Sequence, residues 1–297
     1  MKLLLSNVGA DPKSTAKSAI RNLQRLAAAG LCLFFVPNAL ADTFNPTNAP
    51  FDELLFHVQR YGNTAERRTR KEQSREEFKR RGADSVAYLM EQSHIDNYWI
   101  RIMIDQMRRV VEDQQMAEVL VEFVNAEHED TRKYAVYFLG FTDAPQYADR
   151  VKPLLTDEEV CGAAIRTLGK WKTLTAVPDI ISFLNHDEER KRVSAANALR
   201  DIGDPRAIPH LITALGDPMF TVRNTAARAL ETFGKSAEKA IVKAIDDADL
   251  VPKRQMIRIL GTSQSRKAAR TLKTMLKDPD PGVRRDAKQS LEKLRRL

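Results

Sequence analysis

Apolar residues recur at helical spacing along most of the chain, in short segments separated by residues that end helices. The clearest two segments span residues 204–234, where Gly216-Asp217-Pro218 separates them and Gly234 follows the second. In both segments the apolar positions recur every three or four residues, which is the spacing of one buried helix face. These positions are Ile208, Leu211, Ile212 and Leu215, then Val222, Ala226, Ala227, Leu230 and Phe233. Residues 204–234 are therefore predicted to form two helices joined by a turn.

The same unit returns along the chain with a period of about 31 residues. A period in this range is typical of solenoids, in which each unit stacks only on its neighbours. The matches one period upstream are Leu184, Arg192, Ala195, Leu199 and Gly203, and those two periods downstream run from Leu272 to Leu291. We expect an all-α fold, an α-solenoid of about eight stacked helix–turn–helix repeats. The expected pairs are about 51–82, 83–112, 113–140, 141–169, 170–203, 204–234, 235–261 and 262–297.

The repeated unit resembles the HEAT-like repeats of the HEAT-repeat superfamily, in the short form known from phycobilisome lyases. The resemblance is carried by a proline-bearing first helix, an Asp217-Pro218 turn and a second helix that reads Val-Arg-x-x-Ala-Ala-x-Ala-Leu from Val222. Residues 170–234 carry it most strongly. We divide the chain into atypical N-terminal repeats with a cap (51–112) and HEAT-like repeats (113–297). Since this superfamily mostly supplies binding scaffolds, the resemblance implies protein binding.

Residues 1–41 have the layout of a secretory signal peptide. Basic residues up to Arg25 precede an apolar run from Leu26 to Val36, and Ala39-Leu40-Ala41 has the small residues of a signal-peptidase site. We therefore expect a cleaved leader, a disordered segment over 42–50, and a mature protein that is periplasmic or secreted. After cleavage we expect no stable membrane span. An uncleaved anchor and an organelle presequence are the alternatives.

The charge of the chain depends strongly on this leader. The chain has 48 Lys and Arg against 40 Asp and Glu, a formal charge of +8, which falls to +4 without the five basic residues and one acidic residue of the leader. So small a charge argues against nucleic acid as the partner. The stretch from Glu66 to Arg81 has eight basic and four acidic residues. We interpret it as a solvated capping helix, with a basic binding arm as the alternative.

An arginine recurs once in most repeats, near the start of the second helix. Asp217 and Asp278 precede two of these arginines by six residues, as in the Asp–Arg ladder of HEAT units. Because a guanidinium can bridge turn carbonyls and a carboxylate at once, we interpret these residues as a structural ladder. Its arginines are Arg101, Arg132, Arg192, Arg223, Arg254 and Arg284, and Cys161 occupies the slot that lacks one.

Positions five and eight residues after each ladder arginine are expected to face away from the core. In the HEAT fold the second helices line the concave side, so these positions predict a basic inner track. The candidate partner-binding residues are Arg109, Tyr134, Tyr137, Arg166, Arg200, Arg228 and Arg258. The two tyrosines are included because tyrosine offers rigid contact area with a polar tip. We expect the track to suit a protein partner with an acidic surface.

No motif in the sequence indicates catalysis. The chain has no phosphate-binding loop, no Gly-x-Ser-x-Gly and no zinc-type cysteine spacing. Its five histidines are scattered, and only His128-Glu129 resembles the pairs that hold iron in deoxyhypusine hydroxylase, a protein of similar fold. We therefore expect no enzyme activity, no catalytic residue, no cofactor and no metal.

The predicted function is a non-enzymatic HEAT-like scaffold, exported to the periplasm or cell envelope, that binds a protein through its concave face. One alternative is a binder of an anionic polymer, either nucleic acid or a charged glycan. A lyase or hydroxylase of the same fold is the less favoured alternative. The oligomeric state stays open.

Overall fold

The computed structural model describes residues 44–59, 64–94, 97–263 and 265–296 of the chain. These residues form sixteen α-helices with short 3-10 turns, and the described part of the chain has no β-strand. The predicted all-α class is confirmed. The predicted signal peptide, residues 1–41, lies outside the described residues.

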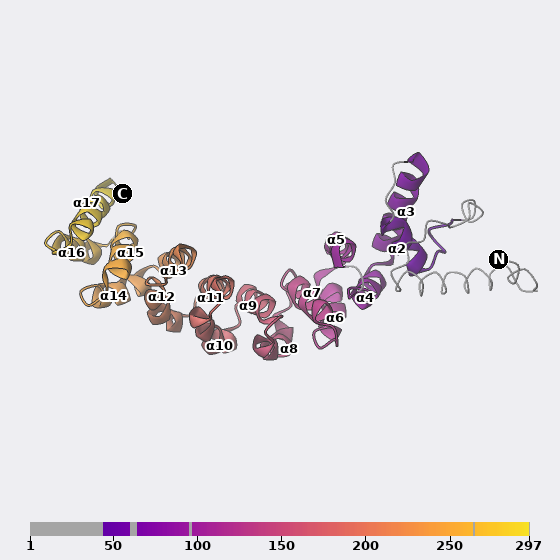
Figure 1. The fold of residues 1–297 in the computed structure, drawn as a ribbon, viewed down its shortest axis with the longest axis horizontal. Helices are drawn as coiled ribbons and strands as arrows, with labels where there is room; N and C mark the ends of the chain where they lie inside the picture. The colour runs from indigo at the N-terminus through magenta and orange to yellow at the C-terminus, as the bar shows by residue number, and fades with distance from the viewer. Residues whose placement is uncertain (1–43, 60–63, 95–96, 264, 297) are drawn as a thin grey trace, which may run out of the picture. The chain divides into compact units, whose positions relative to one another are not determined.

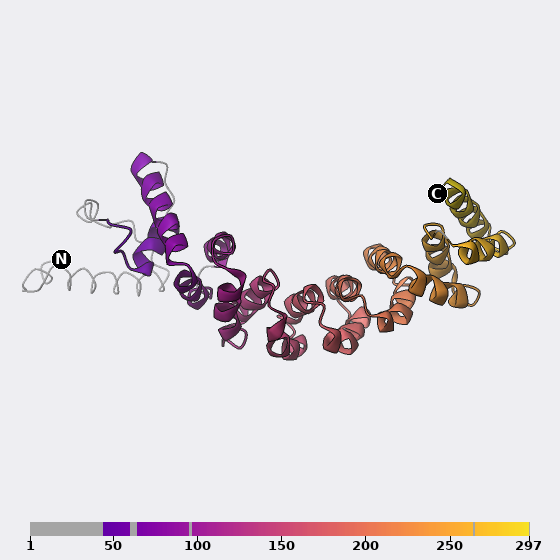
Figure 2. The same ribbon diagram turned by 180° about the vertical axis from the view of Figure 1, so that it is seen from behind.

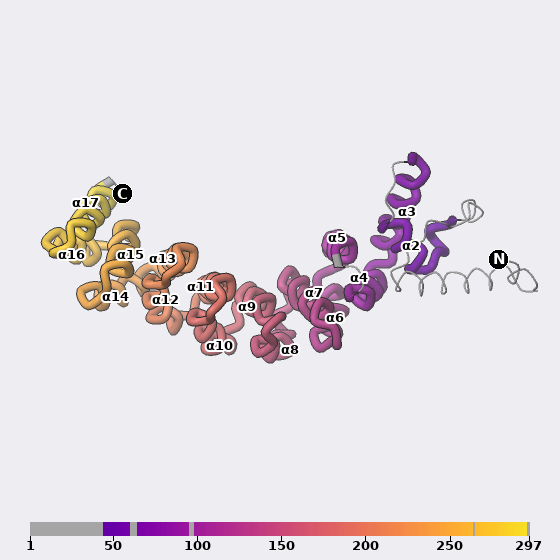
Figure 3. The backbone as a smooth tube through the Cα atoms, in the orientation of Figure 1, coloured from indigo at the N-terminus to yellow at the C-terminus, as the bar shows by residue number. Residues whose placement is uncertain are grey.

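The helices form eight consecutive helix–turn–helix pairs, as the repeat pattern predicts (Figure 1). The chain path from one pair to the next is short, and Figure 3 shows it as a continuous tube. The pairs are α2 (Phe51–Gln59) with α3 (Ala65–Arg81), α4 (Ala83–Glu91) with α5 (Asn97–Met107), α6 (Asp113–Glu122) with α7 (Glu129–Leu139), α8 (Ala148–Val151) with α9 (Cys161–Lys170), α10 (Val177–Ser182) with α11 (Glu189–Ile202), α12 (Ile208–Ala214) with α13 (Phe220–Phe233), α14 (Lys235–Ala244) with α15 (Leu250–Leu260), and α16 (Arg266–Met275) with α17 (Pro281–Arg296).

Prolines shorten the first helices of the middle pairs. Helix α8 has only four residues and is followed by the 3-10 turn Lys152–Thr156, which contains Pro153. Helix α12 follows the 3-10 turn Pro205–Ala207 and carries Pro209 in its first turn. Proline lacks a backbone N–H and clashes with the preceding turn, so it is accommodated only where a helix begins.

The core runs along the contacts between successive second helices. Each second helix from α3 to α15 packs against the second helix of the next pair, and α9, α11 and α13 lie side by side in both views (Figures 1 and 2). One leucine near the end of each of five second helices is completely buried. These residues are Leu139, Leu168, Leu199, Leu230 and Leu260. Full burial of a leucine side chain stabilises a fold by roughly 1.5–3 kcal/mol, so this row is a large part of the stacking energy.

Helices α9 and α11 approach closely at Gly169. A Cβ atom at this position would lie 2.7 Å from both the Cα and the Cβ of Ala198 on α11. Real Cβ atoms do not approach other atoms this closely, so only glycine fits. In contrast, a Cβ atom at Gly162, at the other end of α9, would meet no atom within 4 Å.

Residues 44–50 belong to a separate unit from the helices of Phe51–Leu297. They contain a turn in which the Thr47 N–H donates to the Asn45 carboxamide oxygen at 3.1 Å. Within the described ranges, no helix is both long and apolar enough to cross a bilayer.

The two glycines of α9 offer a matched test of the packing. Gly169→Ala should lower the free energy of unfolding by about 1–3 kcal/mol, because the added methyl group overpacks the contact with Ala198. Gly162→Ala should raise it by about 0.5–1 kcal/mol, because alanine is the better helix former and its methyl group meets open space. Urea denaturation of both variants measures the difference, and equal effects of the two substitutions would contradict the packing described here.

Candidate functional site

Two ladder arginines join neighbouring helix pairs. The Arg192 guanidinium donates from Nη1 to the carbonyls of His186 (2.7 Å) and Asp187 (2.8 Å) in its own turn. Its Nε and Nη2 donate to the Asp217 carboxylate of the next pair at 2.8 and 3.2 Å. Both side chains are nearly buried, with 11% and 8% exposed. Arg132 repeats the arrangement, with carbonyls of its own turn and Asp157 of the next pair, at 3.0 Å from Nε.

The other ladder positions differ from this pattern. Nη1 of Arg223 and of Arg284 donates only to carbonyls of its own turn. Arg254 instead bonds Asp286 on α17 at 2.7 Å. Arg101 is exposed on α5. The carboxylate of Asp278, the expected ladder aspartate of the last pair, pairs with the Lys253 ammonium at 3.5 Å rather than with a ladder arginine.

The reason for these differences is visible in the sequence. Asp157 and Asp217 stand at equivalent places in the repeats that follow Arg132 and Arg192. The equivalent residue after Arg223 is Ala248, whose side chain cannot accept a hydrogen bond, so Arg223 has no carboxylate at the usual place in the next repeat. After Arg254 the equivalent residue is Asp278, but its carboxylate pairs with Lys253, while Arg254 bonds Asp286.

Both residues of this arginine–aspartate pair are replaced in the repeat of Cys161, where the cysteine stands in place of the arginine. The residue equivalent to Asp157 and Asp217 in the following repeat is His186. Here Lys191 makes the connection, bonding Glu158 and, at 2.9 Å, Glu188. The Cys161 thiol donates to the carbonyl of Glu158 (3.3 Å), and its burial raises its pKa. A thiol with a raised pKa is a poor nucleophile at neutral pH, so Cys161 has the properties of a structural residue.

The buried Arg192–Asp217 ion pair should contribute more to the free energy of unfolding than exposed ion pairs do. Asp217→Ala leaves the Arg192 charge without its carboxylate, which should cost about 3–5 kcal/mol of unfolding free energy. The control is Asp179→Ala, which removes the half-exposed contact with Lys152 at 3.3 Å and should cost about 0–1 kcal/mol. Thermal and chemical denaturation measure both. A loss at Asp217 no larger than the loss at Asp179 would contradict the assigned role.

A set of cationic and aromatic side chains gathers where α5, α7 and α9 end. We call it the basic–aromatic cluster, and its members are Arg108, Tyr137, Phe141, Arg166 and Lys170. The Lys170 ammonium lies 3.8 Å from the centroid of the Phe141 ring, and the Arg108 guanidinium lies 4.7 Å from it. Tyr137 meets Phe141 edge to face at 5.0 Å, and the Arg166 guanidinium lies 5.7 Å from the Tyr137 ring. These contacts hold both rings and cations in place.

The cluster carries an excess of positive charge. Burial lowers the pKa of Lys170, and the nearby Arg108 and Arg166 lower it further, while Asp201 acts in the opposite direction. Asp201 itself pairs with Arg200 at 2.8 Å. Among the residues that the structure describes, no carboxylate forms an ion pair with Arg166 or Lys170. An anionic group of a partner would therefore relieve repulsion that the chain itself leaves in place.

The predicted track residues have varied surroundings. Arg109 is exposed and lies 3.7 Å from Asp105, and Arg228 is exposed on α13. Arg200 is half-buried and bonds Asn197 and Asp201. Arg258 lies 3.7 Å from Asp286. Tyr134 is half-buried, which raises the pKa of its hydroxyl. The structure thus brings together Tyr137 and Arg166, while Arg228 and Arg258 belong to later pairs. Their role in binding stays a prediction.

The sequence analysis missed Arg108, Phe141 and Lys170 as members of this site. A signal for two of them is present, since Phe141 and Lys170 have the same separation along the chain as Tyr137 and Arg166. Equal spacing places both pairs at equivalent positions of neighbouring repeats. Arg108 had no such signal, because its contact with the Phe141 ring joins α5 to the turn after α7.

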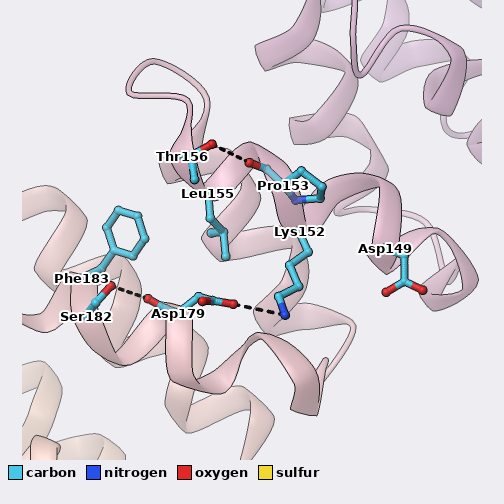
Figure 4. Close-up of a pocket in the computed structure, with 8 residues that line it drawn as sticks. All are labelled: Asp149, Lys152, Pro153, Leu155, Thr156, Asp179, Ser182 and Phe183. Carbon is cyan, nitrogen blue, oxygen red and sulfur yellow. Dashed lines mark hydrogen bonds and ion pairs between the residues drawn. The ribbon is translucent and has the colours of Figure 1, made fainter.

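A second surface feature is an open groove between the first helices of two pairs (Figure 4). It is lined by α8, α10 and the 3-10 turns that follow them, and the Lys152–Asp179 ion pair crosses it at 3.3 Å. The hydroxyls of Thr156 and Ser182 donate to backbone carbonyls of their own turns. These polar groups already have partners, so the groove offers few of them to a ligand.

The described residues contain no group of three or more His, Cys, Asp or Glu side chains placed to hold a metal ion. His94 and His128 do meet, as two stacked imidazole rings 4.4 Å apart.

The repeats match a known family. The HEAT repeats profile matches residues 156–231 and 237–296, which confirms the resemblance expected from the sequence. The solved complex of CpcE and CpcF of phycocyanin lyase from Nostoc sp. PCC7120 is 17% identical, with a TM-score of 0.38, over 85% of this chain and 98% of that one. Human deoxyhypusine hydroxylase is 15% identical, with a TM-score of 0.34, over 83% and 96%. At this level of similarity neither structure indicates a function.

A curated relative changes one expectation. Phycocyanobilin lyase subunit alpha of Nostoc sp. is 37% identical over an alignment of 89 residues that covers 27% of this chain. The match spans about a third of that relative, 32% of its length. A lyase subunit is part of an enzyme, so the expectation that this chain is not an enzyme was wrong.

Proposed function

We propose that this HEAT-repeat protein binds a protein partner through the basic–aromatic cluster, and that the partner presents acidic side chains there. The observation that carries the proposal is the excess positive charge of Arg166 and Lys170 beside the Tyr137 and Phe141 rings. Arg108, which pairs with Asp105 at 3.3 Å, lies against the same Phe141 ring. We further propose that binding takes place in the periplasm or cell envelope, since the leader predicted over 1–41 directs export.

The composition of the cluster favours a protein over a small ion. Tyrosine and arginine are enriched among the residues that dominate binding energy at interfaces, because they bury large areas and also make polar contacts. Tyr137 is exposed enough, at 37%, to be covered by a partner. Its edge contact with Phe141 keeps the ring ordered before binding, which reduces the entropy lost on association.

The charge of the cluster is also suited to recognition. Complementary charges raise the association rate and exclude partners of the wrong sign. The predicted residues Arg109 and Arg200 belong to the second helix pair and to α11, and they would extend the contact to neighbouring repeats. Arg200 is held by Asn197 and Asp201, so its guanidinium is oriented in advance.

Charge reversal in the cluster tests the proposal. Purified protein should capture specific proteins from a cell-envelope extract, identified by mass spectrometry, and Arg166→Glu with Lys170→Glu should reduce that capture by at least about tenfold. The matched control is Lys239→Glu with Lys243→Glu, which makes the same charge change on exposed residues of α14. Circular dichroism verifies that both variants fold. If the cluster variant captures the same proteins as the control, the cluster is not the binding site.

The lyase relative supports a second candidate function, in which the chain takes part in attaching a bilin to a protein. It rests on the 37% identity over 89 residues to a phycocyanobilin lyase subunit. In that case, mixing phycocyanobilin with an equimolar amount of the protein should shift and sharpen the visible absorption band of the bilin. The control is the same titration with protein unfolded in urea. A bilin spectrum that is identical with folded and unfolded protein would exclude this candidate.

A further inference from the structure

Most of the N-terminal half of α3 is exposed. Residues 64–69, Glu72 and Gln73 are exposed, Arg70 and Lys71 are half-buried, and the buried residues of the helix begin only at Ser74. The other half packs against α2 and buries Phe78 (Figure 1). The first turn of α3 therefore contributes nothing to the core, although the helix continues through it.

These exposed turns are strongly basic. Arg67, Arg68, Arg70 and Lys71 lie within five consecutive residues, and Glu66 pairs with Arg70 at 2.7 Å. Positive side chains at a helix N-terminus also oppose the helix dipole, so this placement is unfavourable for the helix alone. A polyanionic surface would offset both sources of repulsion.

In the C-terminal half of α3, each basic side chain has a carboxylate partner within the helix. Lys79 pairs with Glu76 at 2.6 Å, and Arg80 and Arg81 both bond Glu77. The hydrogen bond from Arg80, together with that from Arg81, lowers the pKa of the Glu77 carboxyl to about 2. The C-terminal half of the helix is thus anchored, whereas Arg67 and Arg68 near its N-terminus form no ion pair among the described residues.

Two aromatic residues lie beside the basic turns. The Lys71 ammonium lies 4.3 Å from the centroid of the Trp99 ring at the start of α5, and burial lowers the pKa of Lys71. Tyr98 is 53% exposed and meets Trp99 edge to face at 5.2 Å. Tryptophan and tyrosine next to lysine and arginine are the residue types that bind at the interface of a bilayer.

We propose that the first two turns of α3, together with Tyr98 and Trp99, bind the surface of a membrane that contains anionic phospholipid. Nucleic acid shares the negative charge but is recognised by stacking bases on free aromatic faces. Lys71 already occupies a face of the Trp99 ring, so the pair is a poor stacking platform. At a bilayer, the ring edges and the basic side chains can reach the headgroup level together.

The test uses the intact protein and sedimentation with two kinds of vesicle, phosphatidylcholine alone and phosphatidylcholine with about a third phosphatidylglycerol. We expect binding to the anionic vesicles only, and weakening at high salt because screening reduces the attraction. Arg67→Glu with Arg68→Glu should reduce binding by at least about tenfold. Glutamate is favourable near a helix N-terminus, so this variant should keep its fold. The matched control is Arg266→Glu with Lys267→Glu in the exposed first turn of α16, which should bind as the unmodified protein does.

Tryptophan fluorescence adds a local measurement. The chain has two tryptophans, and Trp171 is buried with its Nε1 donating to the Thr142 carbonyl at 2.8 Å. A blue shift on adding anionic vesicles should therefore come from Trp99 and disappear in Trp99→Phe. Equal binding to both kinds of vesicle, or full binding by the Arg67→Glu/Arg68→Glu variant, would overturn the proposal. So would binding of a single-stranded oligonucleotide without binding of anionic vesicles.

Discussion

The packing of each second helix against the second helix of the next pair is the contact on which the rest of the structure depends. One pair of helices exposes an apolar face that it cannot cover itself, and only the neighbouring pair can bury it. The completely buried Leu168, Leu199 and Leu230 lie at this contact in three successive pairs. At Gly169, where α9 and α11 approach closely, even a methyl group does not fit. Since every unit depends on its neighbours, stability is distributed along the stack.

This stacking also decides which polar groups meet. The Arg192–Asp217 ion pair forms because the turn before α11 lies next to the turn before α13 in the following pair. Where the partner aspartate is missing, the arginine donates hydrogen bonds only to carbonyls of its own turn, as at Arg223. The slot of Cys161 and His186 is the clearest departure, because both residues of the ion pair differ and Lys191 joins the loops instead. Ion pairs inside the stack are thus adjusted locally, while the apolar contact persists.

The two proposed binding surfaces are separate in this molecule. The basic–aromatic cluster lies at the ends of α5, α7 and α9, whereas the basic turns of α3 lie in the first helix pair. Both hold cations beside aromatic rings. The similarity to a lyase subunit is compatible with either surface, because the residues of a repeat protein that face outward can change without disturbing the stacking.

The sequence alone determined the eight helix pairs and their order, because helical periodicity and the Gly and Pro residues at turns act over a few residues. It also predicted that Tyr137 and Arg166 belong to one surface, since positions relative to a repeat can be counted, and the two side chains do lie near each other. It did not determine which charged residues are neutralised. Lys170 lies near Arg108, which belongs to a helix pair two repeats earlier, and Arg254 pairs with Asp286 rather than with an earlier aspartate. Such contacts form only after neighbouring pairs have stacked, so the charge balance of the surface is a property of the tertiary structure.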